Sequence, residues 1–130
     1  MQAVKSRDTK PELKVRRLLH RLGYRFRLHR KQLPGTPDIV FPGRRCVVFV
    51  HGCFWHGHDC PKGRLPKSRT DYWREKIVRN KERDAKAEVE LTILGWRTLT
   101  IWQCETIAED ALTSKLTQFL GPPTKNRSTS

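Results

Sequence analysis

The sequence has no long apolar run. No stretch approaches the roughly 18 consecutive apolar residues that would suggest a membrane-spanning helix. The first residues, MQAVKSRDTK, lack the apolar core of a secretory signal peptide. Internal repeats and long low-complexity stretches are absent as well. We therefore expect a single globular domain in the cytoplasm, since 130 residues suit one hydrophobic core better than two.

Acidic residues are scarce. The chain has 13 aspartates and glutamates against 27 lysines and arginines, which gives a formal net charge of +14. The imbalance is greatest in the first 45 residues, which hold thirteen basic and three acidic side chains. Clustered positive charge suits a polyanion, because each lysine or arginine that neutralises a phosphate releases condensed counterions. The composition favours a nucleic-acid partner, but charge alone does not distinguish DNA from RNA.

The four cysteines favour metal binding over disulfides. A chain without an export signal is expected to stay in a reducing compartment. Cys53, His58 and Cys60 lie close together in the sequence, and Cys104 ends a later predicted strand. Tetrahedral zinc accepts such a set of three cysteines and one histidine, although the spacing is not that of a zinc finger. Cys46 lies inside an apolar strand and is more simply a core residue.

Helical and strand patterns alternate along the chain. Thr9 and Glu12 form a capping-box pattern, and Gly23 is placed to end the helix that follows. Two short apolar runs flank a Pro-Gly turn and predict a β-hairpin, whose second strand is apolar enough to be covered on both faces. The predicted elements are helices at 10–22, 70–94 and 107–120, and strands at 39–41, 46–50 and 97–104. This order predicts an α/β fold, a mixed β-sheet flanked by helices over residues 1–120, with a disordered tail at 121–130.

The helix predicted at 70–94 has two polar residues on its inward stripe. The stripe at helical spacing consists of Trp73, Ile77, Asn80, Asp84, Ala87, Leu91 and Leu94. Burying Asn80 and Asp84 without partners would cost about 2–7 kcal/mol each, so we expect them to face a polar group inside. The alternative is that the stripe frays there and both side chains are exposed. The last helix is expected to pack Ile107, Leu112, Leu116, Phe119 and Leu120 against the core.

Asp38 and three histidines are the candidates for catalysis. Asp38 begins the first hairpin strand, where the core of a nuclease would hold a hard cation such as magnesium, although an ordinary turn aspartate is the alternative. If His58 binds zinc, His51 and His56 remain near Asp38, and a neutral imidazole is the usual general base. Spacing alone leaves the three histidines interchangeable between zinc binding and catalysis.

Two aromatic residues lie inside the predicted metal loop. Phe54 and Trp55 follow Cys53 directly, where a core role for both is hard to arrange. Exposed aromatic side chains on a basic protein stack on bases or wedge between them. Packing over the zinc site is the alternative.

Three sequence blocks and Asp38 together resemble the very-short-patch repair (Vsr) endonuclease family. The blocks are VFVHGCFWHGHDC, YWREKIVRNKERD and LGWRTLTIWQCE, and the similarity covers about residues 5–119. The resemblance implies a restriction-endonuclease-like fold, related to the PD-(D/E)xK nucleases, with a structural zinc site. It implies a magnesium-dependent endonuclease that nicks one strand of double-stranded DNA at T·G mismatches, which arise when 5-methylcytosine deaminates. Such an enzyme would work as a monomer in the bacterial nucleoid, beside mismatch-repair or methyltransferase partners.

The resemblance implies roles for individual residues at the magnesium site. Asp38 and the main-chain carbonyl of Val50 match the magnesium ligands. His56 matches the histidine that activates the attacking water. His51 matches the histidine beside the hydrated metal, and Asp84 matches an aspartate near these histidines.

The resemblance also implies zinc-binding and DNA-binding residues. The matching zinc ligands are Cys53, His58, Cys60 and Cys104. The aromatic residues that match those inserted beside the mismatch are Phe54, Trp55 and Trp73. Glu12 matches a glutamate implicated in activity, yet the capping box with Thr9 explains it without chemistry. Two other classes remain open: a non-catalytic zinc-containing DNA-binding module, and a restriction-type enzyme that cuts paired DNA.

Overall fold

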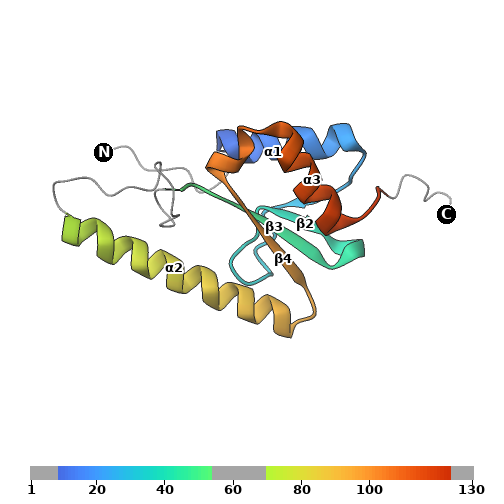
Figure 1. Cartoon of the computed structure of the whole chain (residues 1–130). Helices are drawn as coiled ribbons and strands as arrows, with labels where there is room; N and C mark the ends of the chain where they lie inside the picture. The colour runs from blue at the N-terminus through green and yellow to red at the C-terminus, as the bar shows by residue number, and fades with distance from the viewer. Residues whose placement is uncertain (1–8, 54–69, 124–130) are drawn as a thin grey trace.

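The computed structural model describes residues 9–53 and 70–123, which form a mixed sheet flanked by helices (Figure 1). The helices are α1 (Lys10–Leu22), α2 (Thr70–Ile93) and α3 (Glu109–Leu120), and the strands are β1 (Arg27–Leu28), β2 (Ile39–Phe41), β3 (Cys46–His51) and β4 (Arg97–Trp102). Two short 3-10 helices, η1 (Pro42–Arg44) and η3 (Gln103–Thr106), follow β2 and β4. The predicted α/β class and the mixed sheet are confirmed.

The sheet has the order β1-β2-β3-β4. The hairpin of β2 and β3 is antiparallel, with Ile39 opposite Val48 and Phe41 opposite Cys46. β4 pairs with β3 in parallel, after the long connection through α2. The two-residue strand β1, which pairs with β2 at the edge of the sheet, was not predicted because it is too short to have an alternating pattern.

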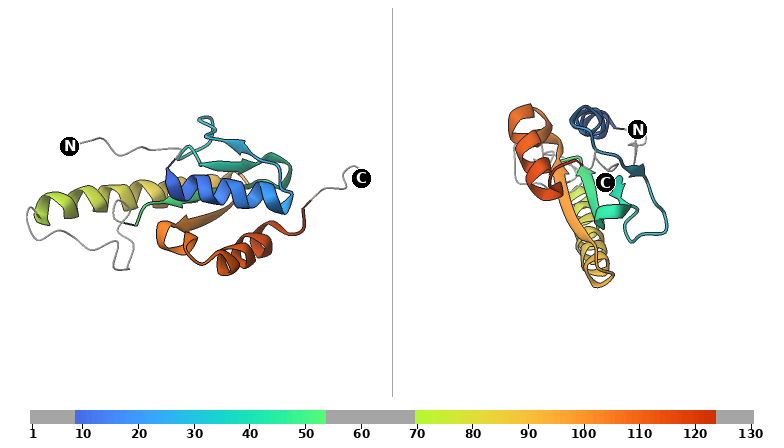
Figure 2. Two further views of the ribbon diagram at one scale, coloured as in Figure 1. Left: turned by 90° about the horizontal axis from the view of Figure 1, so that it is seen from above. Right: turned by 90° about the vertical axis from the view of Figure 1, so that its right-hand side faces the viewer.

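Helices cover both faces of the sheet, with α1 and α3 on one side and α2 on the other (Figures 1 and 2). The core on the first side joins Leu19 of α1, Val48 of β3 and Leu116 of α3. A smaller core on the other side joins Val47, Phe49 and Leu91. The alternation of β3 side chains between the two cores confirms that this strand is covered on both faces. α2 is longer than the sheet, and its first turns project past the sheet's end (Figure 2).

The first helix begins and ends where its capping residues predict. The Thr9 hydroxyl accepts a hydrogen bond from the Glu12 main-chain N–H at 3.4 Å. Gly23 adopts a left-handed conformation with φ 94°, and its N–H bonds back to the last turn. Beyond the cap, the N–H of Tyr24 bonds to the Leu19 carbonyl at 3.0 Å, which turns the chain toward β1.

The elements around β4 differ in their ends from the prediction. The strand stops at Trp102 because the Glu105 side chain accepts the Trp102 N–H at 2.8 Å and starts a 3-10 turn. Cys104 therefore lies in η3 rather than in the strand. α3 starts at Glu109, so Ile107 lies outside it and is 68% exposed, and its predicted place in the core is wrong. Leu94 follows the end of α2 and is also exposed.

The chain beyond α3 is held against the body of the protein as far as it is described. Arg44 donates hydrogen bonds to the carbonyls of Leu120 (2.6 Å) and Pro122 (2.8 Å). The Tyr24 hydroxyl donates to the carbonyl of Gly121. Gly121 and Pro122 of the predicted tail thus contact the rest of the fold, and residues 124–130 lie outside the described residues. No helix in the described part of the chain is long and apolar enough to cross a lipid bilayer.

Candidate active site

Asp38 is buried at the start of β2 and is held against the backbone of β3. Ile39 of β2 and Val48 of β3 form the last backbone pair before the start of β2. Beyond it, the main-chain N–H of Val50 donates to Asp38 Oδ2 at 2.7 Å. The Asp38 carboxylate thus continues the hydrogen bonding of β3 where the β2 backbone departs. This contact fixes the carboxylate at the end of the sheet, with 8% of the residue exposed.

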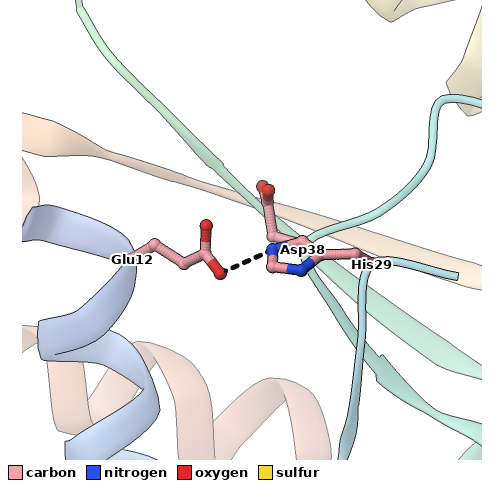
Figure 3. Close-up of side chains that lie close together, drawn as sticks. All are labelled: Glu12, His29 and Asp38. Atoms are coloured by element: carbon pink, nitrogen blue, oxygen red, sulfur yellow. Dashed lines mark hydrogen bonds and ion pairs between the residues drawn. The ribbon is translucent and has the colours of Figure 1, made fainter. Parts of the chain in front are cut away.

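Glu12 and His29 converge on Asp38 from two other elements (Figure 3). Glu12 lies on α1 and is 1% exposed. Its Oε2 atom lies 2.8 Å from His29 Nε2 and accepts a hydrogen bond from Arg16 Nη1 at 3.2 Å. The donor atoms that Glu12, His29 and Asp38 could offer to a metal all lie within 4.8 Å of one another. The capping box therefore accounts for the Glu12 main-chain N–H but not for its buried carboxylate.

Burial sets the protonation of Asp38. Loss of solvent raises the pKa of Asp38 from 3.8 to about 7, the Val50 N–H opposes that shift, and the negative charge of Glu12 adds to it. Two carboxylates that share a buried site favour a bound cation, because the cation supplies the charge compensation that water no longer gives. Carboxylate oxygens are also the ligands that Mg²⁺ prefers, so the site fits the magnesium that the motifs predicted.

The same pKa shift predicts how pH changes the stability of the magnesium-free protein. Between about pH 4 and pH 7 the unfolded chain releases the Asp38 proton while the folded chain keeps it, so stability falls as pH rises and stays low above pH 7. A pKa shift of about three units lowers the free energy of unfolding by at most about 4 kcal/mol. Asp38→Asn is therefore expected to raise the free energy of unfolding at pH 8 by up to that amount, and by only about 1 kcal/mol near pH 4.5.

Urea unfolding of both proteins at the two pH values, in magnesium-free buffer, checks this expectation. Added Mg²⁺ should stabilise the parent protein and not the variant. A variant that is less stable than the parent protein at pH 8 would contradict the burial argument.

His51 and Asp84 form a second polar pair, on the face of the sheet covered by α2. His51 Nδ1 lies 3.8 Å from Asp84 Oδ2, and the side chains are 11% and 28% exposed. The imidazole also packs against Phe49 and Trp102, with ring centroids 5.6 and 5.4 Å away. The prediction that Asp84 faces a polar group inside is confirmed. Asn80, one turn earlier, is half-buried and accepts a hydrogen bond from Arg83 on the same helix.

The chain is similar in sequence to known proteins over most of its length. The sequence profile described as DNA mismatch endonuclease Vsr matches residues 1–62. The type II nicking enzyme V.XorIIP of Xanthomonas oryzae pv. oryzae is 60% identical over 122 residues, which cover 94% of this chain and 90% of that protein. The DNA mismatch endonuclease Vsr of Escherichia coli is 42% identical over 125 residues, which cover 92% of this chain and 80% of that protein. The chain belongs to the Vsr family. The predicted resemblance and the predicted class of DNA endonuclease are thereby confirmed.

Part of the Vsr motif HGCFWHGHDC lies outside the described residues. The structure describes the motif as far as Cys53. The predicted water-activating residue, two of the zinc ligands and two of the aromatic residues therefore have no described position; they are His56, His58, Cys60, Phe54 and Trp55. The third aromatic residue, Trp73, is half-buried in the first turn of α2 and packs edge-on against Tyr72 at 5.0 Å.

The two described cysteines of the predicted zinc set follow paired positions of adjacent strands. His51 of β3 is in register with Trp102 of β4, and these strands are parallel. Cys53 and Cys104 each come two residues later, at the same end of the sheet. Cys53 is buried and Cys104 is half-buried. Both cysteines therefore leave the sheet at the same end, each two residues beyond the last paired position.

The sequence prediction missed one residue of the cluster around Asp38, His29. It follows the two-residue strand β1, and its N–H donates to the Asp38 carbonyl at 3.2 Å. It also has a left-handed backbone, with φ 48°. Neither feature has a sequence signal beyond a histidine a few residues before the Leu-Pro-Gly turn, so the side chain could not be connected to Asp38 without the strand pairing.

Proposed function

We propose that the protein is a magnesium-dependent mismatch endonuclease that nicks one strand of double-stranded DNA at a T·G mismatch. The observation that carries the proposal is the buried Asp38 carboxylate, held by the Val50 N–H beside Glu12 at the end of the sheet. A DNA-binding module has no use for two buried carboxylates at one point, since each opposes binding of a phosphate backbone. The names of its relatives, a DNA mismatch endonuclease and a type II nicking enzyme, support the reaction type.

Asp38 and the carbonyl of Val50 would hold the magnesium. In an extended strand the N–H and C=O of a residue that pairs with a neighbour point toward the same side. Because the Val50 N–H points at Asp38, its carbonyl faces the same region, beyond the end of β2. When bound, magnesium would polarise the scissile phosphate and lower the pKa of a coordinated water.

The remaining polar residues would orient the reacting groups. His56 would take the proton of the attacking water, and Glu12 would face the metal from the α1 side of the site. His51 lies beside Asp84 on the α2 side. It would hydrogen-bond to water bound at the magnesium site, near the leaving group. Attack at phosphorus would leave a 3′-hydroxyl and a 5′-phosphate. The alternative for Glu12, a helix cap alone, leaves its buried contacts with Arg16 and His29 without a purpose.

A structural zinc would join the ends of β3 and β4. The proposed ligands are Cys53, His58, Cys60 and Cys104. Two thiolates at equivalent positions beyond adjacent parallel strands are a suitable half of a tetrahedral site, because one ion then ties the loop after β3 to η3. This link would fix the aromatic residues Phe54 and Trp55 relative to Asp38, and Trp73 would complete the set that enters the DNA.

A nicking assay tests the proposal. A duplex with one T·G mismatch, labelled on each strand in turn, is incubated with the protein and Mg²⁺, beside the same duplex with full pairing. We expect a single nick in the thymine-containing strand of the mismatched duplex and none in the paired duplex. Cleavage of both strands of the paired duplex would indicate a restriction enzyme. Binding without any nick, at several Mg²⁺ concentrations, would indicate a non-catalytic binding module.

A further inference from the structure

His29 supplies a nitrogen donor to a group of side chains that otherwise offers carboxylate oxygens. The cluster brings together α1 through Glu12, the residue after β1 through His29, and the residue before β2 through Asp38 (Figure 3). Their potential donor atoms lie within 4.8 Å of one another, which is close enough for one cation to contact all three after small side-chain movements. The His29 side chain is only 12% exposed, so its ring lies inside the site rather than over it.

The backbone at His29 is arranged to direct this ring inward. β1 pairs with β2 through Leu28 opposite Ile39, and the His29 N–H extends the pairing to the Asp38 carbonyl at 3.2 Å. The φ of 48° at His29 is uncommon for a residue with a side chain. The sheet maintains this conformation, and the imidazole points to Glu12 Oε2 at 2.8 Å.

The imidazole of His29 could bind a metal ion, which a lysine or arginine side chain at this position could not. Arg16 already offers Glu12 Oε2 a permanent positive charge, at 3.2 Å, so charge compensation does not require a second basic residue. A guanidinium or ammonium group cannot bind a metal, whereas neutral imidazole donates a nitrogen lone pair. Mg²⁺ prefers oxygen ligands throughout, while first-row transition metals bind imidazole well. Mn²⁺ shares the octahedral oxygen coordination of Mg²⁺ and, as a first-row transition metal, also accepts an imidazole nitrogen.

We propose that Glu12, His29 and Asp38, together with the Val50 carbonyl, form a mixed oxygen and nitrogen site that binds Mn²⁺ more tightly than Mg²⁺ through His29 Nε2. The inference deepens the proposed function, because it concerns the metal of the same site. On binding, the single proton of the neutral ring resides on Nδ1, and coordination replaces the contact between Nε2 and Glu12. Mg²⁺ still serves the reaction through the oxygen ligands.

Metal binding by the full-length protein tests this inference. The protein is prepared without chelator, transferred to metal-free buffer and titrated with MnCl₂, with free Mn²⁺ followed by electron paramagnetic resonance. Mg²⁺ affinity is measured by competition. His29→Gln is the informative variant, because glutamine still offers Glu12 an N–H donor but no nitrogen lone pair. We expect Mn²⁺ to bind about tenfold more weakly to the variant and Mg²⁺ affinity to change by less than about threefold.

A spectroscopic measurement separates metal ligation from a positioning role. Mn²⁺ bound to the parent protein should show a nitrogen coupling in its electron spin-echo spectrum, and His29→Gln should reduce or remove it. The matched control is His20→Gln, at an exposed histidine on α1 that stacks on Phe26 at 4.8 Å. It should leave both affinities and the nitrogen coupling unchanged.

Equal losses of Mn²⁺ and Mg²⁺ affinity, or an unchanged nitrogen coupling, would overturn the inference, because His29 would then only orient Glu12. These results would leave nicking of the T·G duplex with Mg²⁺ untouched, so the proposed function would stand. Conversely, a protein that binds Mn²⁺ through His29 but nicks no duplex would preserve the metal site and refute the proposed function.

Discussion

Asp38→Asn is expected to lower the rate of nicking by roughly 10³-fold while the affinity for the T·G duplex stays nearly unchanged. Asparagine keeps the size of the side chain, and its carbonyl oxygen can still accept the Val50 N–H, so the fold at the end of the sheet is preserved. It has no negative charge with which to bind the proposed magnesium ion. A loss of three decades corresponds to about 4 kcal/mol of transition-state stabilisation.

Single-turnover nicking and a gel-shift titration on the same duplex measure the two quantities separately. Duplex binding should persist because lysine and arginine contacts to phosphates supply most of the affinity, and none of them is altered. The matched control is Asp110→Asn, the same substitution on the exposed first turn of α3, which should nick at the parental rate. Nicking by Asp38→Asn within about tenfold of the parent protein would mean that another ligand holds the metal.

The parts of this fold that could be predicted from sequence depend on short-range physics. Thr9 and Gly23 mark the ends of α1 because both act within one helical turn. The hairpin of β2 and β3 follows from two apolar runs around a Pro-Gly turn. Asp84 could be assigned to the inward stripe of α2 because helical periodicity fixes which face a residue occupies, and the structure puts it beside His51.

The composition of the Asp38 cluster could not be predicted in the same way. Glu12 and Asp38 are 26 positions apart in the sequence, and their proximity depends on how α1 packs on the sheet. The raised pKa of Asp38 has no local cause, since burial by surrounding elements is its largest source. His29 depends on a two-residue strand with an unusual backbone conformation at its end. Each of these features is a property of tertiary packing, which a single sequence does not specify residue by residue.

The end of β3 brings the polar groups together from both faces of the sheet. Its Val50 N–H holds Asp38, whose other neighbours come from the α1 side, while the next residue, His51, meets Asp84 on the α2 side. Val50 makes its contact through the main chain, in the plane of the sheet, and the His51 side chain points to the α2 face, so two consecutive residues contact both groups. The strand itself is buried and closely paired on both sides, which makes it a rigid support for chemistry that depends on placement.

Removal of the proposed zinc is expected to have the largest effect on stability. Apparent binding free energies of structural zinc sites are about 10–16 kcal/mol, which matches or exceeds the net stability of about 5–15 kcal/mol of a whole domain. Cys104→Ser is therefore expected to lower the zinc content from about one equivalent per chain to nearly none and to abolish cooperative thermal unfolding. Elemental analysis of protein purified without chelator, together with calorimetry, measures both results.

Cys46→Ala is the control that separates metal binding from burial. Cys46 is 0% exposed, and its sulfur accepts a hydrogen bond from Arg97 at 2.9 Å, whereas Cys104 is half-buried in η3. If burial alone determined the effect, the Cys46 substitution would be the more damaging of the two. Zinc ligation predicts the reverse order: Cys46→Ala should keep its zinc and lose only about 1–2 kcal/mol of stability. A parent protein that contains no zinc, or a Cys104→Ser variant that retains a full equivalent, would refute the assignment.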